Sequence, residues 1–259
     1  IVAATHALIN KRDSRSSMIW IILCLTLPII GALSYYIFGI NIVERKAKRL
    51  NITNSQSDKK NELIINHQIS IDEEYKSFVK ISDIIEECPL LFGNQVTLLR
   101  HGEGAYPQML ESIKLAKNLI LLSTYIFDND KIGNQFLEAL SQAKARGVKV
   151  FVLIDGVGAL YSLPSIFHKI KKADITCEKF LPFKLFPPSF SINLRNHRKI
   201  LVVDNYVGFA GGINISDRHQ GMNGRIRKVS DMHFMFHGPI VAQLYDVFCK
   251  DWSMTTGKK

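Results

Sequence analysis

The sequence is poor in cysteine and in clustered metal ligands. Its four cysteines form no CxxC pair, so we expect neither a zinc ribbon nor a disulfide framework, and we predict reduced, buried thiols. The eight histidines are scattered. The two nearest each other, His233 and His237, lie in the run MHFMFH, which alternates like a strand and would separate their rings. We therefore predict no metal site and no cofactor.

Acidic residues are outnumbered, with 33 Lys and Arg against 23 Asp and Glu, which gives a net charge of +10. That excess favours an anionic partner such as lipid headgroups, nucleic acid or a phosphorylated substrate, and does not choose among them. The chain of 259 residues is long enough for one sizeable domain with attachments, or for two small domains.

Charged residues are missing altogether from Ser16 to Val43, and the run MIWIILCLTLPIIGALSYYIF within this segment is strongly apolar. The run exceeds the ~20 residues that a helix needs to cross a bilayer, and Pro and Gly are tolerated inside membrane spans. A signal peptide has a shorter apolar core and a small-residue cleavage site. We predict a transmembrane helix over about 18–40.

The regions around this segment divide the chain into three. Residues 1–9 are apolar and are typical of the tail of an earlier hydrophobic segment, so that 10–17 would be the tight turn of a membrane hairpin. Basic residues flank the span, three before it and four after it, which weakly favours a cytoplasmic second flank. We predict a membrane anchor at 1–43, a basic juxtamembrane region and linker at 44–77, and a folded domain at 78–259.

Strands and helices alternate in this domain. Strands are predicted at 95–100, 118–127, 148–154, 200–203, 207–210 and 232–236, and helices at 106–116, 131–146, 164–172 and 240–252. The run HGEG after the first strand is typical of a turn. Near-continuous apolar strands are typical of buried parallel strands, so the order predicts an α/β sandwich with a mixed sheet.

The stretch RNHRKILVVDNYVGFAGGIN, residues 195–214, combines residue types that suit a phosphate diester. His197 and Lys199 are two residues apart, so on a strand both face the same side and converge on one ligand. Lys199 brings a fixed positive charge, and His197 brings a nitrogen that can attack phosphorus or carry a proton. Such a pair suits a transition state whose negative charge is spread over phosphate oxygens.

Further residues extend this predicted phosphate site. Asp204 either holds a cationic group or fixes a turn. Gly211 and Gly212 remove side chains, so that the backbone can approach a ligand, and Asn214 adds an amide donor. Arg198 faces away from the site on strand parity. Each feature alone is also explained as a solvated charge, a turn or a bulge, and only their order makes the set specific.

The pattern His-x-Lys-x4-Asp-x6-Gly-Gly-x-Asn over 197–214 resembles the signature of the phospholipase D superfamily. The text around it is similar to bacterial cardiolipin synthases. Residues 6–39 resemble their membrane hairpin turn and second span, 125–158 their sheet-and-helix core, and 238–252 the helix that closes their first catalytic half. The resemblance implies a phospholipase D-like α-β-α sandwich, preceded by a transmembrane helix, with 78–259 as a catalytic half-domain.

The resemblance also implies a reaction, in which a phosphatidyltransferase joins two phosphatidylglycerol molecules into cardiolipin and glycerol through a phosphohistidine. His197 would be the nucleophile, Lys199 and Asn214 the phosphate clamp, and Asp204 a structural and electrostatic support. Asp231 stands where family members carry a carboxylate that orients a catalytic imidazole, although a lone Asp at a strand start is equally often a turn residue.

Partners and location follow from the same resemblance. It implies phosphatidylglycerol and anionic membrane lipid as partners, at a bacterial plasma membrane with the catalytic domain on its cytoplasmic face. The apolar segment argues for a lipid substrate and against nucleic acid.

A second H-x-K motif is absent, because none of the seven other histidines has a Lys two residues after it. The family site needs two motifs related by approximate two-fold symmetry. Three interpretations stay open: a fragment or truncated product of a cardiolipin synthase without its second half, a one-motif phosphodiesterase of phospholipase D or nuclease type that is active as a homodimer, and an inactive membrane module that binds anionic lipid. We favour the first, because the chain does not begin with Met and ends where the family's first half gives way to the second.

Overall fold

The computed structural model describes residues 1–11, 13–40, 72–86, 92–160, 164–182, 195–220 and 229–257. Most of the predicted juxtamembrane region and linker lies outside these residues.

The N-terminal region is a helical hairpin. Helix α1 (Val2–Asn10) is followed by α2 (Ser14–Thr26), and the side chain of Asp13 caps α2 by accepting a hydrogen bond from the backbone N–H of Ser16 at 2.9 Å. The two helices contact each other through Ser17, whose hydroxyl donates to the carbonyl of Ala7 at 3.2 Å. The chain reverses inside the predicted range 10–17, although α1 continues to Asn10 and α2 already begins at Ser14.

The continuous helix predicted over about 18–40 is wrong. Helix α2 ends at Thr26, and after Leu27 a separate helix α3 (Pro28–Ser34) leads into a π-helical turn (Tyr35–Gly39). The break has a local cause: the proline ring disfavours helical backbone at the preceding residue, and Leu27 has φ −127° and ψ 77°. Pro28 then opens α3, a position where its missing N–H costs nothing. Among the described residues no helix combines the length and the apolarity that crossing a bilayer requires.

Helix α5 (Glu73–Glu86) crosses the boundary predicted between residues 77 and 78. Two glutamates in its first turn complement the helix dipole. The side chains of Tyr75, Phe78 and Ile81 are exposed.

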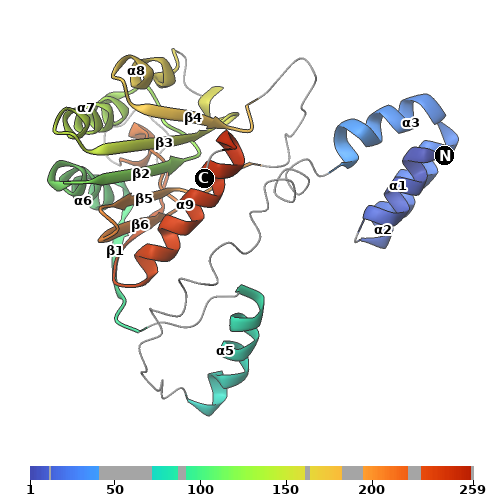
Figure 1. Ribbon diagram of the computed structural model, residues 1–259, viewed down its shortest axis with the longest axis horizontal. Helices are drawn as coiled ribbons and strands as arrows, with labels where there is room; N and C mark the ends of the chain where they lie inside the picture. The colour runs from blue at the N-terminus through green and yellow to red at the C-terminus, as the bar shows by residue number, and fades with distance from the viewer. Residues whose placement is uncertain are drawn as a thin grey trace.

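One seven-stranded sheet follows, in the order β1-β7-β6-β5-β2-β3-β4 (Figure 1). The strands are β1 (Gln95–Arg100), β2 (Leu119–Thr124), β3 (Lys149–Asp155), β4 (Thr176–Phe180), β5 (Ile200–Val203), β6 (Val207–Gly211) and β7 (Met232–His237). Strands β2, β3 and β4 run parallel, and β5, β6, β7 and β1 are antiparallel to their neighbours. The predicted mixed sheet is confirmed. Strand β4 was not predicted, because it is a short edge strand with polar Glu178 and Lys179 at its centre.

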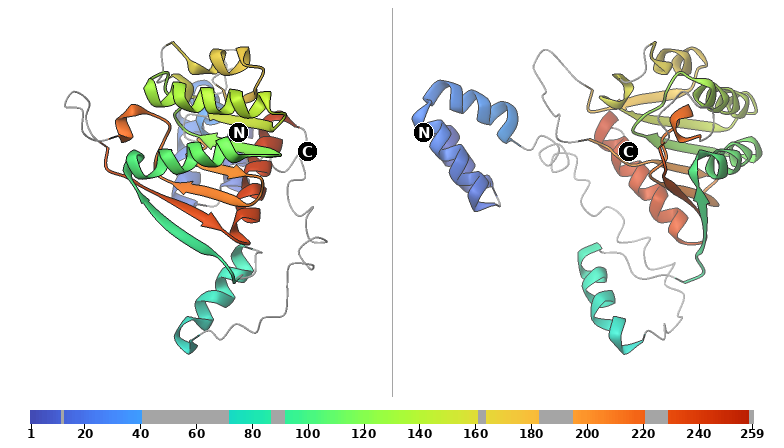
Figure 2. Two further views of the ribbon diagram at one scale, coloured as in Figure 1. Left: turned by 90° about the vertical axis from the view of Figure 1, so that its left-hand side faces the viewer. Right: turned by 180° about the vertical axis from the view of Figure 1, so that it is seen from behind.

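Helices cover both faces of the sheet and make the predicted α-β-α sandwich (Figures 1 and 2). Helices α6 (His101–Leu115), α7 (Lys131–Ala145) and α8 (Ile166–Lys172) lie on one face, and α9 (Ile240–Thr256) lies on the other.

The turn predicted at HGEG is wrong, because these residues form the first turn of α6. Gly102 is required there by packing: a Cβ atom on it would lie 2.8 Å from the carbonyl oxygen of His219.

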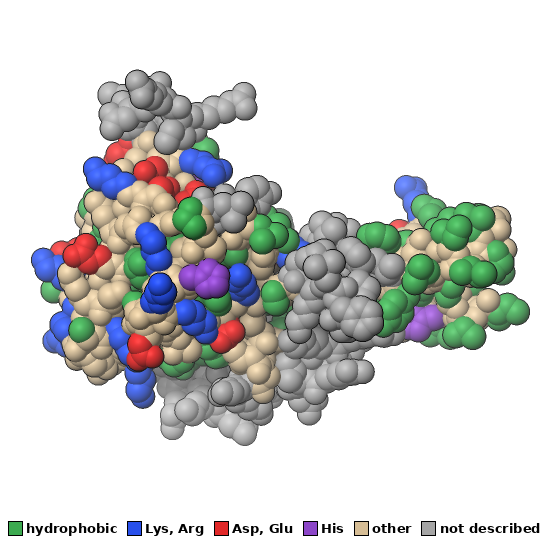
Figure 3. Space-filling view, turned by 90° about the horizontal axis from the view of Figure 1, so that it is seen from above, with side chains coloured by type: hydrophobic (Ala, Val, Ile, Leu, Met, Phe, Trp, Pro, Cys, Tyr) green, Lys and Arg blue, Asp and Glu red, His purple; other side chains and the backbone are tan. Residues whose placement is uncertain are grey.

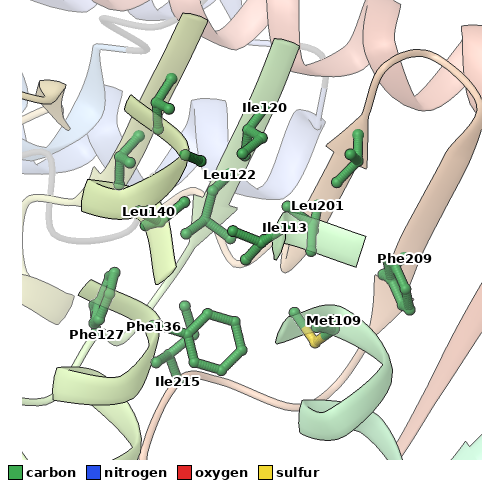
Figure 4. Packing of buried hydrophobic residues seen from close by; sticks show 14 of the residues in the cluster. Met109, Ile113, Ile120, Leu122, Phe127, Phe136, Leu140, Leu201, Phe209 and Ile215 are labelled. Atoms are coloured by element: carbon green, nitrogen blue, oxygen red, sulfur yellow. The ribbon is translucent and has the colours of Figure 1, made fainter. Parts of the chain in front are cut away.

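The larger core lies between the sheet and helices α6 and α7 (Figure 4). Met109 and Ile113 of α6, and Phe136 and Leu140 of α7, are the buried positions of the stripes that helical periodicity predicts. They pack on Ile120, Leu122, Leu201 and Phe209 of the sheet. Each such side chain contributes about 1.5–3 kcal/mol on burial, so this core holds the strands in fixed register.

The strand directions determine where the motif lies. Because β5 is antiparallel to β2, the beginning of β5 meets the end of β2, with Ile200 opposite Ser123. Likewise the end of β6 meets the beginning of β7, with Gly211 opposite His233. Residues just before β5, just after β6 and at the beginning of β7 therefore gather at one edge of the sheet.

Candidate active site

The His197 and Lys199 side chains converge at this edge. Residues 195–199 precede β5 without regular structure, so the predicted strand begins only after the pair. The predicted convergence nevertheless holds: Lys199 Nζ lies 2.9 Å from His197 Nδ1 and donates to the His197 carbonyl at 2.7 Å. Tyr125 packs against both, with its ring 4.7 Å from the imidazole and 5.4 Å from Lys199 Nζ. Lys199 is buried and His197 is exposed.

Burial and charge change the protonation of this pair. Burial lowers the pKa of Lys199 to about 8, against the opposing effect of Asp231 and Asp155. The pKa of His197 is lowered first by burial and then by the charge of Lys199. At neutral pH His197 is therefore mainly neutral and has a lone pair on one ring nitrogen.

Asn214 is held with its amide oxygen turned toward the protein. Its Oδ1 accepts the backbone N–H of Ile126 at 3.1 Å, and its backbone carbonyl accepts the hydroxyl of Tyr106 at 2.7 Å. Its backbone N–H donates to His219 Nε2 at 3.3 Å. These contacts fix the side chain so that its NH₂ group points away from the Ile126 amide, and the donation by Asn214 to a ligand stays a prediction.

Gly211 and Gly212 pack closely against β7 and the residue before it, and their approach to a ligand stays a prediction. A Cβ atom on Gly212 would lie 2.0 Å from Asp231 Oδ1, and one on Gly211 would lie 2.6 Å from His233 Cα. The Gly212 N–H donates to the carbonyl of Met232 at 2.9 Å. Gly211 therefore leaves room for the backbone of β7 and Gly212 leaves room for the Asp231 side chain just before it, while the Gly212 N–H is used by Met232.

Asp231 lies near two imidazoles and Lys199. Its Oδ1 accepts the N–H of Met232 at 2.8 Å. Its charge opposes the lowering of the pKa of Lys199, His219 and His233, which burial causes in each case. It therefore favours the protonated forms of Lys199 and of these two imidazoles.

Asp204 is not brought to the site. It lies at the far end of β5 with φ +52°, and its carboxylate accepts the backbone N–H groups of Lys117, Asn118 and Leu119, each at 2.8 Å. Burial alone would raise the pKa of Asp204, but these three hydrogen bonds outweigh it and lower the pKa. Of the two predicted roles the structure assigns the turn, and the prediction of a catalytic Asp204 is wrong because its oxygens are used at the opposite edge of the sheet.

A polar network behind His197 was missed. Arg198 Nη1 donates to both carboxylate oxygens of Asp251 in α9, each at 2.7 Å. The Asn196 side chain donates to Asp251 at 2.9 Å, and its backbone N–H donates to Asp155 at 3.0 Å. The prediction from strand alternation that the Arg198 side chain points away from Lys199 is in agreement with its contact with Asp251. The same alternation places the Asn196 and Arg198 side chains on one side of the chain. That spacing was the sequence signal available for a second group of polar side chains, which faces Asp251 of α9.

Two buried imidazoles also join the site from outside the motif. His233 is fully buried, and burial lowers its pKa to about 4, so it is neutral. His219 is buried beside Asn214 and accepts its backbone N–H. No sequence signal singled out either residue, because their position depends on where β7 and the segment after β6 pack.

The fold and this geometry define the class of protein: a mixed α/β sandwich with a convergent His197–Lys199 pair at one edge of its sheet. Residues 109–252 match the family described as cardiolipin synthase, PLD-like domain, and residues 1–39 match the phospholipase D-nuclease N-terminal family. The chain belongs to the cardiolipin synthase family with a phospholipase D-like domain.

Individual relatives agree. Cardiolipin synthase of Alkalihalophilus pseudofirmus is 30% identical over 256 residues, which are 96% of this chain and 50% of that protein. Cardiolipin synthase A of Pseudomonas putida is 30% identical over 264 residues, 99% of this chain and 54% of that protein. This chain spans about half the length of the curated relatives it matches. NucT from Helicobacter pylori shares the fold, with a TM-score of 0.51 and 14% identity over 63% of this chain and 98% of that one.

Proposed function

We propose that this chain carries the nucleophile of a phosphatidyltransferase that joins two phosphatidylglycerol molecules into cardiolipin and glycerol. The observation that carries the proposal is the His197–Lys199 pair, 2.9 Å apart at one edge of the sheet, inside the region that matches cardiolipin synthases.

In the first step His197 attacks the phosphorus of phosphatidylglycerol. A bond forms between a ring nitrogen and phosphorus, and the bond from phosphorus to the headgroup glycerol oxygen breaks. The lowered pKa of His197 supplies a neutral imidazole for this attack. Attack through Nε2 requires the ring proton on Nδ1, the nitrogen that faces Lys199. A bound phosphate would draw the ammonium of Lys199 away from Nδ1 and release that nitrogen to hold the proton.

Lys199 and Asn214 then stabilise the charge that develops on the phosphate oxygens. Lys199 is buried, so its charge acts in a region of low dielectric, where a fixed donor is worth more than in water. Asn214 is held by Ile126 and Tyr106, so its amide is positioned before the substrate arrives.

A second acid–base group completes the cycle. It gives a proton to the departing glycerol, and it takes a proton from the hydroxyl of the second phosphatidylglycerol as that oxygen attacks phosphorus and the nitrogen–phosphorus bond breaks. The chain has one H-x-K motif. We propose that this second group comes from a second motif, on a further catalytic half or on a second copy of the chain, facing the exposed side of His197.

We further propose that residues 1–40 place the site at a membrane. The large apolar side chains of α1, α2 and α3 are mostly exposed, among them Ile19, Ile22 and Ile29. Figure 3 shows hydrophobic side chains over much of the surface of these helices. Such an exposed apolar surface favours contact with lipid, in agreement with a lipid substrate.

The test is to trap the covalent adduct. The full chain, kept in an amphipathic polymer, is mixed with phosphatidylglycerol, quenched in base and analysed by peptide mass spectrometry. We expect a phosphatidyl group on His197, and its complete loss in His197→Ala. His168→Ala is the matched control, because His168 is exposed on α8 and outside the site, and it should leave the adduct unchanged.

Two other outcomes decide against the proposal. Binding of phosphatidylglycerol without any adduct, both for the chain alone and after a second motif-bearing half has been added, indicates a lipid-binding module. An adduct that persists in His197→Ala shows that the nucleophile is another residue.

A further inference from the structure

The segment that carries His197 is held by groups from other elements, because residues 195–199 precede β5 without regular structure. A nucleophile has to be held within about 0.5 Å of its productive position, which irregular backbone does not achieve by itself. Two buried carboxylates contact this segment: Asp155 at the end of β3, and Asp251 in the last turns of α9. They contact different parts of it.

Asp155 fixes the beginning of the segment. Its Oδ2 accepts the backbone N–H of Asn196 at 3.0 Å, and its Oδ1 accepts the N–H groups of Val157 and Gly158 at 2.8 and 3.1 Å. Arg195 Nη1 lies 3.8 Å from the same carboxylate. Three backbone donors use these oxygens, so Asp155 joins the segment to the turn that follows β3.

Asp251 contacts the residues on both sides of His197. The Asn196 amide donates to its Oδ2 at 2.9 Å, and Arg198 Nη1 donates to both carboxylate oxygens at 2.7 Å. The Asn196 Oδ1 in turn accepts the backbone N–H of Arg198 at 3.1 Å. The residues before and after His197 are therefore joined to each other and to α9, while the imidazole lies beside Lys199, whose Nζ is 2.9 Å from Nδ1.

The position of Asp251 on α9 would suit an apolar residue. The other buried positions of this helix are Val241, Phe248 and Met254. Burial raises the pKa of Asp251, against the opposing effect of Arg198. A buried ion pair adds little net stability over apolar side chains of similar size, because desolvation offsets the attraction. A gain in stability therefore does not account for this carboxylate, whereas its contacts beside His197 do.

We infer that Asp251 is a positioning residue for the reaction at His197. Its carboxylate acts through Asn196 and Arg198, which hold the backbone on both sides of His197 and so direct the imidazole toward Lys199 and the phosphorus. The inference rests on the proposed function, because it takes His197 to be the nucleophile.

The test uses two readouts that a purely structural carboxylate would leave unchanged, both on the full chain in an amphipathic polymer. The first is the pKa of the His197 imidazole, followed by NMR of protein with isotope-labelled histidine and assigned with His197→Ala. The second is the rate of adduct formation per folded molecule as a function of phosphatidylglycerol concentration, measured with and without an added second motif-bearing half.

In Asp251→Leu we expect the pKa of His197 to rise toward its ordinary value, because a displaced imidazole escapes the burial and the Lys199 charge that lower it. The maximal rate should fall by about 10²-fold, as a misplacement of about 1 Å causes. The concentration at half-maximal rate should stay unchanged, since Lys199 and Asn214 are intact. Leu140→Val is the control: it removes a methylene from the larger core, lowers stability and should change neither readout.

The double variant Asp251→Leu/Arg198→Met replaces the ion pair by apolar side chains. It should be more stable than Arg198→Met alone, which leaves a buried carboxylate without its cation, yet its maximal rate should be no higher than that of Asp251→Leu. This variant covers the case in which Asp251→Leu fails to fold. Asp251→Asn keeps the size and exchanges one acceptor for a donor, so both readouts should move less, in the same direction.

Three results would decide otherwise. Reduced stability with an unchanged His197 pKa and maximal rate in the Asp251 variants would show that Asp251 serves the fold alone, while the proposed function stands. A raised half-maximal concentration with an unchanged maximal rate in Arg198→Met would also overturn the inference, because Arg198 would then bind the substrate directly. A wild type that forms no adduct, even with the second half, would overturn the proposed function, and the pKa of His197 would still decide whether Asp251 positions the imidazole.

Discussion

The two ends of strand β5 differ although they belong to one motif and are separated by only four residues. Before the strand, Lys199 is buried with an acceptor at the His197 carbonyl and a pKa lowered to about 8. After the strand, Asp204 accepts three backbone N–H groups, and its pKa is lowered by them. At the beginning of β5 the buried ammonium of Lys199 lies beside the exposed imidazole of His197. At the end of β5 the carboxylate of Asp204 is satisfied by three backbone donors.

The difference shows how to separate chemistry from folding within a motif. A buried charge that the protein satisfies only in part destabilises the folded state, and it persists where function needs it. A carboxylate with several backbone donors stabilises a turn and has little left for a ligand. The following substitutions test whether Lys199 serves the reaction and Asp204 serves the fold.

The largest expected effect is that of Lys199→Met on adduct formation at His197. Removing the buried cation should slow the reaction by about 10²–10³-fold, as the loss of one preorganised transition-state donor does. Stability in urea should stay equal or rise, because Met fills the site without a charge. Lys149→Met, at an exposed position at the start of β3, is the control and should change neither quantity. If Lys199→Met instead lost stability markedly and formed the adduct at the normal rate, Lys199 would have a structural role and not a catalytic one.

Asp204→Ala should lower the stability of the fold and leave the rate of adduct formation unchanged. Three backbone N–H groups lose their acceptor, so the free energy of unfolding should fall by about 1–3 kcal/mol, while the rate per folded molecule stays unchanged. Asp174→Ala is a matched control: Asp174 also has a positive φ, of 54°, and its side chain is 95% exposed with a single ion pair to Lys144 at 3.7 Å. Because an exposed ion pair contributes little, this variant reports mainly the backbone effect.

The sign of the pH effect follows from the lowered pKa of Asp204. Its contribution is fully present above the ordinary carboxyl pKa and is lost as pH falls through the lowered, folded-state pKa. Urea titrations should therefore show a weaker acid dependence in Asp204→Ala than in the wild type. An equal acid dependence in both proteins would show that these three hydrogen bonds contribute nothing.

The smallest effect concerns pH at the Lys199 end. The pKa of about 8 means that the ammonium is lost as pH rises through this value, so adduct formation should fall by about tenfold per pH unit above it. Lys199→Arg keeps its charge at these pH values and should remove this alkaline limb, whatever its rate at neutral pH. An alkaline limb that survives in the Arg variant would assign it to another group.

Much of the fold was predictable because its signals are local. Helix α7 shows its buried stripe, including Phe136 and Leu140, in its own periodicity, and β2 and β3 are plain apolar runs. Strand β4 was missed because an edge strand of five residues with Glu178 and Lys179 has no such signal. The helix predicted over 18–40 was wrong because hydropathy summed over a window does not register what Pro28 does to Leu27.

In the site, too, local features were predictable from the sequence and long-range contacts were not. Spacing alone predicted that His197 and Lys199 converge, since residues two apart in extended backbone face the same side. Asp204 belongs to the same motif, yet its partners are Lys117, Asn118 and Leu119, 85 to 87 residues away.

The sequence by itself therefore determined the residue types of a phosphate site, their order and the family to which they point, because these depend on spacing along the chain. Only the tertiary structure decided which of them share one edge of the sheet, that Gly211 gives space to β7 and Gly212 to Asp231, and that Asp251 of α9 holds Arg198. The physical reason is that strand direction and helix packing bring together groups from distant segments, and pattern within a single segment carries no record of those contacts.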